Sequence, residues 1–140
     1  MSALVVTTCR AGSDMETTVI FSDGSGRELC RFNAERAVSP EEQSRGLMFR
    51  RHMDDRSGML FVNREDGMRF FWMKNTYIPL DLVFIGAGGD VKHVHYGAKP
   101  LDETPISSVY PVMYILEVNA GAAKKCHIVR GTKMATAKKK

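Results

Sequence analysis

The chain has 140 residues, of which 44% are hydrophobic and 26% are charged. This length suits one domain with one core, and the composition is that of an ordinary globular protein rather than of a disordered or membrane-spanning one. The net charge of +4 does not indicate nucleic-acid binding, because seven of the 20 basic residues follow position 123 and no acidic residue does, so that the rest of the chain has a net charge of −3.

We expect three segments along the chain: a flexible leader over residues 1–15, a single β domain over 16–135 and a basic, disordered tail over 136–140. Met15 is a second candidate for the true start. The apolar stretch from Ala3 to Val6 is too short for a secretory signal and follows no charged residue, which predicts a cytoplasmic protein.

Three cysteines, Cys9, Cys30 and Cys126, are an odd number without short spacing. This pattern indicates free thiols rather than a disulfide framework or a zinc knuckle.

The first predicted elements are a hairpin and a short helix. Residues 17–21 and 28–38 are rich in β-forming residues, and the glycine-containing segment between them suits a turn. Ser39 is the predicted N-cap of the helix, Pro40 its first residue, Glu42 the partner in a capping box and Gly46 its end.

The remainder reads as short strands over residues 58–62, 70–75, 80–85, 91–96 and 112–118. A tight turn is predicted over 86–90 and a long, proline-containing loop over 97–111. Asn119 is the predicted N-cap of a small helix that ends at Lys125. Close strand spacing and only two short helices predict a mostly β fold, a small antiparallel sandwich or barrel.

The richest polar chemistry surrounds the only tryptophan. Trp72 is followed by Lys74, Asn75 and Asp81 within strongly apolar sequence. If residues 70–75 alternate as a strand, Trp72 and Lys74 share one face, and the strand ends bring the polar groups to one rim. An indole with a cation, an amide and a carboxylate suits a sugar or another polar ring compound.

Five motifs in order resemble the uncharacterised family known as domain of unknown function 192. They are Arg45-Gly46-Leu47-Met48-Phe49-Arg50, Gly58-Met59-Leu60-Phe61, Phe71-Trp72-Met73-Lys74-Asn75-Thr76, Ile78-Pro79-Leu80-Asp81 and Glu117-Val118-Asn119-Ala120-Gly121. The resemblance implies a small, jelly-roll-like β domain of bacteria and archaea with no established activity. Many family members look exported behind a signal peptide, a pattern from which this chain departs.

The family motifs supply our candidate ligand-binding residues, which are Arg45, Trp72, Lys74, Asn75, Asp81 and Asn119. We predict a binding module for a small molecule or a glycan segment, with a cleft near Trp72. One alternative is a hydrolase or lyase that uses Asp81 as base and Lys74 as electrostatic stabiliser, so whether the chain is an enzyme stays open. Another is a structural or interaction domain, in which the same residues only clamp the fold.

His93 and His95 lie one residue apart on a predicted strand and so point to one face, a spacing that can ligate a transition metal. A third and a fourth ligand are missing nearby in the sequence. We therefore predict no metal site, no cofactor and no specific nucleic-acid partner. The sequence indicates neither the ligand nor the oligomeric state.

Overall fold

The structure is a computed structural model and describes residues 16–138. The expected leader over 1–15 and the last two lysines lie outside the described residues. A seven-stranded sheet with the order β6-β5-β8-β3-β2-β1-β9 forms the body. Its strands are β1 (Glu16–Ser22), β2 (Glu28–Ala37), β3 (Ser57–Gly67), β5 (Leu80–Ile85), β6 (Val91–Ala98), β8 (Val112–Asn119) and β9 (Lys133–Lys138).

The sheet folds over on itself in a sandwich-like arrangement. Its two edge strands meet at one end, where the backbone N–H of Met134 donates to the carbonyl of Gly89 at 2.7 Å and Asp90 forms a bridge with Lys133. The predicted small, mostly β sandwich is confirmed. The pairing of β2 with β3 is parallel, whereas the other neighbouring strands of this sheet are antiparallel.

Helix α1 (Pro40–Arg45) begins as its sequence predicts. The Ser39 hydroxyl accepts a hydrogen bond from the backbone N–H of Glu42 at 3.1 Å, and the Glu42 carboxylate accepts one from the N–H of Ser39 at 2.9 Å. These reciprocal bonds satisfy two of the donors that a helix start leaves open. The N–H of Ser39 also holds the pKa of Glu42 below its ordinary value.

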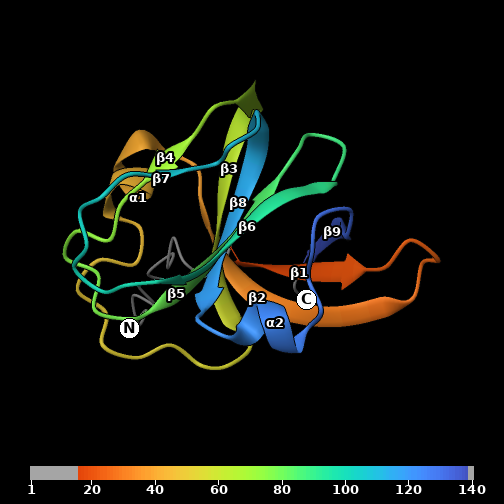
Figure 1. Ribbon diagram of the computed structural model, residues 1–140, viewed down its shortest axis with the longest axis horizontal. Coiled ribbons are helices and arrows are strands. Elements are labelled where there is room, and N and C mark those ends of the chain that lie inside the picture. The colour runs from red at the N-terminus through yellow and green to blue at the C-terminus, as the bar shows by residue number, and fades with distance from the viewer. Residues whose placement is uncertain (1–15, 139–140) are drawn as a thin grey trace, which may run out of the picture.

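A second sheet pairs β4 (Phe70–Phe71) with β7 (Ile106–Ser107), and it lies beside α1 over one side of the main sheet (Figure 1). The predicted strand over 70–75 is wrong beyond Phe71. Its hydrogen bonds go to loops instead: the N–H of Met73 donates to Asp102 at 2.8 Å, and Asn75 takes a positive φ of 54°.

The main sheet has a hydrophobic core on each face. The first core includes Phe21, Phe32, Val83, Leu116 and Ile128. The second lies beneath α1 and the small sheet and includes Leu47, Phe61, Met73, Phe84 and Ile115. Alternate residues of β5 and β8 enter different cores, as the two-residue period of a strand requires.

Helix α2 (Ala122–Lys125) differs from its prediction at its start. Its N-cap is Gly121, in a left-handed conformation that suits glycine, and the cap has no side-chain bond. The Asn119 side-chain amide does not cap this helix and donates instead to the carbonyls of Met53 and Asp54. Neither α1 nor α2, the helices of the part of the chain that the structure describes, is long and apolar enough to cross a membrane.

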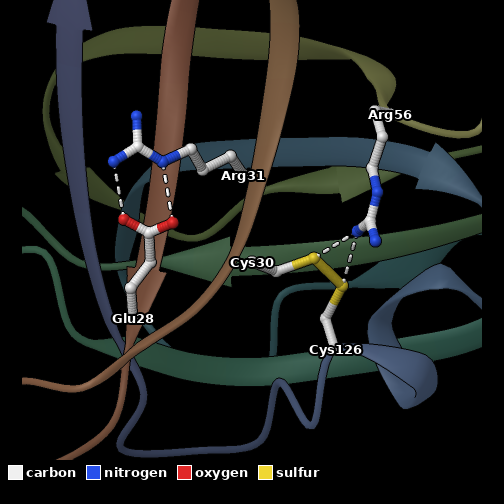
Figure 2. A network of polar contacts seen from close by, with 5 residues as sticks. All are labelled: Glu28, Cys30, Arg31, Arg56 and Cys126. Carbon is white, nitrogen blue, oxygen red and sulfur yellow. Dashed lines mark hydrogen bonds and ion pairs between the residues drawn. A yellow bond between two sulfur atoms is a disulfide. The ribbon is translucent and has the colours of Figure 1, made fainter.

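Cys30 on β2 forms a disulfide with Cys126, which directly follows α2 (Figure 2). The prediction of free thiols is therefore wrong for this pair. The two residues are 96 positions apart in sequence, and the fold brings their Cα atoms to 5.6 Å. The Arg56 guanidinium donates to both sulfur atoms and so joins the segment before β3 to this link.

The predicted tail begins too early. Thr136, Ala137 and Lys138 belong to β9 and pair with Val19, Thr18 and Thr17 of β1. Composition suggested disorder because residues 136–140 contain three lysines and no large apolar side chain. The structure likewise leaves the side chains of Thr136, Ala137 and Lys138 exposed. Backbone pairing along an edge strand does not require apolar side chains, and this is why the charge pattern missed it.

Candidate functional site

A cleft of about 530 Å³ opens between α1 and the segment around β4. We name it the Trp72 cleft. Its lining combines apolar and polar residues of α1, β3, β4, β8 and the loops beside them, namely Pro40, Gln43, Ser44, Arg45, Gly46, Leu47, Met48, Phe61, Asn63, Met68, Arg69, Phe70, Phe71, Trp72, Thr76 and Glu117.

Glu117 on β8 is the acidic residue of this lining, and only 5% of it is exposed. Its neighbours across the sheet are Met59 on β3 and Leu82 on β5, so apolar side chains flank it on the same face. Its carboxyl group has no hydrogen bond or ion pair with any residue of 16–138. Burial raises the pKa of Glu117 to about 8, because a low-dielectric surrounding disfavours the charged form.

Two guanidinium groups belong to the wall of the cleft. Arg69 is held by the backbone: its Nε donates to Val112 at 3.3 Å and its terminal nitrogen to Glu65 at 2.7 Å, in each case to the carbonyl oxygen. Arg45 is exposed at the end of α1, and its guanidinium has no hydrogen bond or ion pair within the described part of the chain. Neither charge is neutralised by an ion pair with a described residue.

An exposed aromatic lip borders the cleft. Trp72 is 47% exposed and Phe70 is 65% exposed. The Lys74 ammonium lies 5.0 Å from the centre of the Trp72 ring, within the range of a cation–π contact. The predicted neighbourhood of Trp72 and Lys74 thus exists, although it rests on a loop and not on strand alternation.

Asp81, another sequence-predicted site residue, lies on the opposite face of the sheet from Glu117. It is fully buried, and its carboxylate accepts three backbone hydrogen bonds, from Gly97 at 2.8 Å, Gly121 at 2.9 Å and Ala123 at 3.1 Å. Asp81 therefore joins β5, the end of β6 and the start of α2. Both of its oxygen atoms thus accept hydrogen bonds within the fold.

Asn75 and Asn119 also hold local structure and are not in the lining of the cleft. The carbonyl of Asn75 accepts from the N–H of Phe49 at 2.7 Å. The side-chain amide of Asn119 donates to the carbonyls of Met53 and Asp54, at 2.8 and 3.3 Å. Of the six predicted residues, the cleft lining contains Arg45 and Trp72, and Lys74 stacks on the latter.

His93 and His95 on β6 face Phe84 and Leu82 on the neighbouring strand. The ring of His93 stacks on Phe84 with a centroid separation of 5.8 Å. Burial, together with neighbouring His95, lowers the pKa of His93. Within 16–138, no group of three or more His, Cys, Asp or Glu residues has a metal-binding arrangement.

Sequence reasoning missed Glu117 as a site residue. A signal was available, because Glu117 follows Ile115 at a two-residue interval on an otherwise apolar face of a predicted strand and belongs to one of the family motifs. A carboxyl group at such a core position needs either a partner or a function. Arg69 carried no comparable signal in its local sequence.

The fold and the cleft define a class: a single β domain with one mixed aromatic and polar cleft beside a short, capped helix. The chain belongs to the DUF192 family, described as "Uncharacterized ACR", whose model matches residues 21–136. None of the curated proteins compared with the chain matches it.

Two solved structures are similar over most of the chain. One, from Sinorhizobium meliloti 1021, is provisionally described as a transcription regulator; it is 38% identical, with a TM-score of 0.84, over 91% of this chain and 98% of that one. The other, from Novosphingobium aromaticivorans DSM 12444, is described as a protein of unknown function. It is 39% identical, with a TM-score of 0.79, over 84% of this chain and 83% of that one.

Proposed function

We propose that the chain is a binding module that takes a small polar ring compound, such as one sugar unit of a glycan, in the Trp72 cleft. The observation that carries this proposal is the side chain of Glu117, which is only 5% exposed, lines the cleft and has no hydrogen bond or ion pair from its carboxyl group within 16–138. No buried side-chain oxygen of 16–138 lacks a hydrogen bond, so the unpaired oxygens of Glu117 are open to the cleft, where a ligand can bond to them.

The rest of the lining suits the same ligand. The Trp72 indole offers a flat apolar face on which a ring can stack, and Lys74 already contacts that ring. Arg45 supplies donors at the wall without a competing partner within the described residues. In this proposal Arg45, Trp72, Lys74, Arg69 and Glu117 contact the ligand, whereas Asn75, Asp81 and Asn119 support the surrounding structure.

A hydrolase or lyase that uses Asp81 and Lys74 is less well supported. A general base must reach the proton that it removes. The oxygen atoms of Asp81 are bonded to backbone N–H groups and the residue is fully buried, while Lys74 lies at the exposed lip. No observation favours a second function over binding.

The provisional description of the Sinorhizobium relative does not lead us to propose DNA binding. A helix-turn-helix protein places a recognition helix in the major groove. The helices over residues 16–138 have six and four residues, too short for that role.

Tryptophan fluorescence tests the proposal directly, because Trp72 is the only tryptophan. We expect a saturable change in emission, with an increase in melting temperature, for at least one compound in a panel of monosaccharides, nucleosides and ring carboxylic acids. Calorimetric binding should then be lost in Trp72→Ala and retained in Val129→Ala, which removes a similarly exposed apolar side chain outside the cleft lining. A panel without any fluorescence or melting change contradicts the proposal.

The cytoplasmic location remains a prediction, and the disulfide bears on it. A link between Cys30 and Cys126 is typical of oxidising compartments, whereas cytoplasmic thiols are usually kept reduced. Alkylation of free thiols at the moment of cell lysis, followed by mass spectrometry, distinguishes the cytoplasm from an oxidising compartment. Modified Cys30 and Cys126 support the cytoplasm, and an intact link between them contradicts it.

A further inference from the structure

We infer that the ring compound bound in the Trp72 cleft carries a carboxylate, which Arg45 and Arg69 recognise while Glu117 hydrogen-bonds to the same ligand. This inference rests on the proposed function and narrows the ligand to one chemical class. Three observations support it: the charges that line the cleft, the absence of a bonding partner for the Glu117 carboxyl group within 16–138, and the exposed aromatic lip.

The charge of the cleft is positive on balance. Arg45 and Arg69 belong to the lining, and Lys74 lies at the lip over Trp72. Glu117 is the acidic side chain in this lining, and neither arginine has an ion pair within residues 16–138. Guanidinium groups bind carboxylates through parallel charge-assisted hydrogen bonds. An anionic ligand therefore supplies the ion-pair partner that neither arginine has among the described residues.

The protonation of Glu117 is consistent with a cleft of positive charge. Burial raises its pKa to about 8, so that near neutral pH the group is largely an uncharged acid. It then leaves the positive charge of the cleft intact, and its O–H can donate to a ligand oxygen. Arg45 and Arg69 are the other charged groups that line the same cleft, and the side chains beside Glu117 on β3 and β5 are the apolar Met59 and Leu82.

The lip selects a ring over a simple anion. Phe70 and Trp72 are exposed large aromatic side chains at the mouth of the cleft, and Met68 is an exposed apolar neighbour. An inorganic anion would leave these surfaces in water, whereas a ring compound covers them and gains from their burial. The volume of about 530 Å³ accommodates a compound of this size.

Three sugars of nearly the same shape test the inference on the intact chain. D-glucuronate, D-glucose and D-glucosamine present an anionic, a neutral and a cationic ring at about pH 6. We expect glucuronate to bind at least about tenfold more tightly than glucose, and glucosamine more weakly than either. Benzoate separates the two sources of a ring carboxylate: binding by benzoate alone assigns an aromatic acid, and binding by glucuronate alone assigns a uronic acid.

Substitutions identify the groups responsible. Arg45→Gln should weaken binding of the preferred acid about tenfold and binding of glucose less than about twofold. Arg64→Gln is the matched control, because Arg64 is an exposed arginine of β3 outside the cleft lining. Affinity for the acid should fall as the pH rises from about 7 to 9, and Glu117→Gln, which keeps the shape of the neutral acid, should remove this fall.

The outcomes separate the inference from the proposed function. If glucose or glucosamine binds as tightly as the ring acids or more tightly, and Trp72→Ala abolishes that binding, the inference is overturned and the proposed binding function stands. Preference for inorganic phosphate over every ring acid also overturns it. Absence of binding by all the sugars and by benzoate, together with a silent panel in the fluorescence test, overturns both.

Discussion

Replacement of Asp81 by alanine should destabilise the fold strongly, because this carboxylate holds three backbone segments together. Its three bonds reach Gly97, Gly121 and Ala123. The N–H of Ala123 is in a buried residue, and leaving it without an acceptor costs about 1–3 kcal/mol. The two glycines are exposed, so water can accept from their N–H groups when the carboxylate is removed. Each of these two bonds therefore contributes about 0.5–1.5 kcal/mol to stability.

We therefore expect Asp81→Ala to lower the free energy of unfolding by about 4 kcal/mol. Asp81→Asn should cost about half as much, because its carbonyl oxygen can still accept from Gly121 and Ala123. Urea denaturation followed by far-ultraviolet circular dichroism measures both values by linear extrapolation. Asp55→Ala is the control, since Asp55 is exposed and should shift stability by no more than about 0.5 kcal/mol.

A stability of Asp81→Ala within about 1 kcal/mol of the wild type, at an unchanged denaturant slope, would refute the clamp. It would also restore Asp81 as a candidate for chemistry, because a residue that the fold does not need requires another reason for its burial.

Three further predictions concern the helix cap, the disulfide and the buried acid. Ser39→Ala should cost about 0.5–2 kcal/mol, measured by urea denaturation, because the Ser39 hydroxyl caps α1; equal midpoints would contradict this. The double variant Cys30→Ser and Cys126→Ser should cost about 2–5 kcal/mol through loss of a link across 96 positions, and an unchanged melting temperature would show that the link is not formed in solution. Glu117 keeps its proton in the folded state until about pH 8, while an unfolded chain releases it near the ordinary value of 4.5. The free energy of unfolding should thus fall as pH rises through this window, and Glu117→Gln should flatten the fall; parallel pH curves for the two proteins would contradict the raised pKa.

The local part of the fold was predictable from the sequence. The start of α1 depends on residues within four positions of Ser39, so the capping box and Pro40 were sufficient. Strand β5 was predicted with its observed bounds, because five of the six residues between Pro79 and Gly86 are apolar and Pro79 and Gly86 limit the run on both sides.

The non-local part was not predictable in the same way. Residues 72–75 keep the alternation of a strand, yet their hydrogen bonds go to distant loops, such as the one from Met73 to Asp102. The Asn119 amide bonds to Met53, which is 66 positions away, rather than capping the neighbouring helix. Local pattern carries no information on such partners, and the same holds for the pairing of Cys30 with Cys126.

In the candidate site, contacts between residues close in sequence were predictable, and those that depend on strand order were not. Trp72 and Lys74 are two positions apart, so their contact was within reach of sequence reasoning. Asp81 was placed at the same rim because it is close in sequence, but the period of β5 turns it into the first core while Leu82 enters the second. Glu117 reaches the cleft from a strand 45 positions beyond Trp72, and only the sheet order β5-β8-β3 brings it there.

Nuclear magnetic resonance titration of the Trp72 indole N–H tests ligand binding in the cleft most directly, because the chain has one tryptophan and therefore one such signal. On addition of D-glucuronate or benzoate, we expect a saturable shift of this signal, accompanied by shifts of backbone amides at the end of α1 and around Glu117. A Trp72 indole signal that stays in place while either compound shifts amides elsewhere on the domain, or shifts none, would contradict binding of a ring carboxylate in the Trp72 cleft.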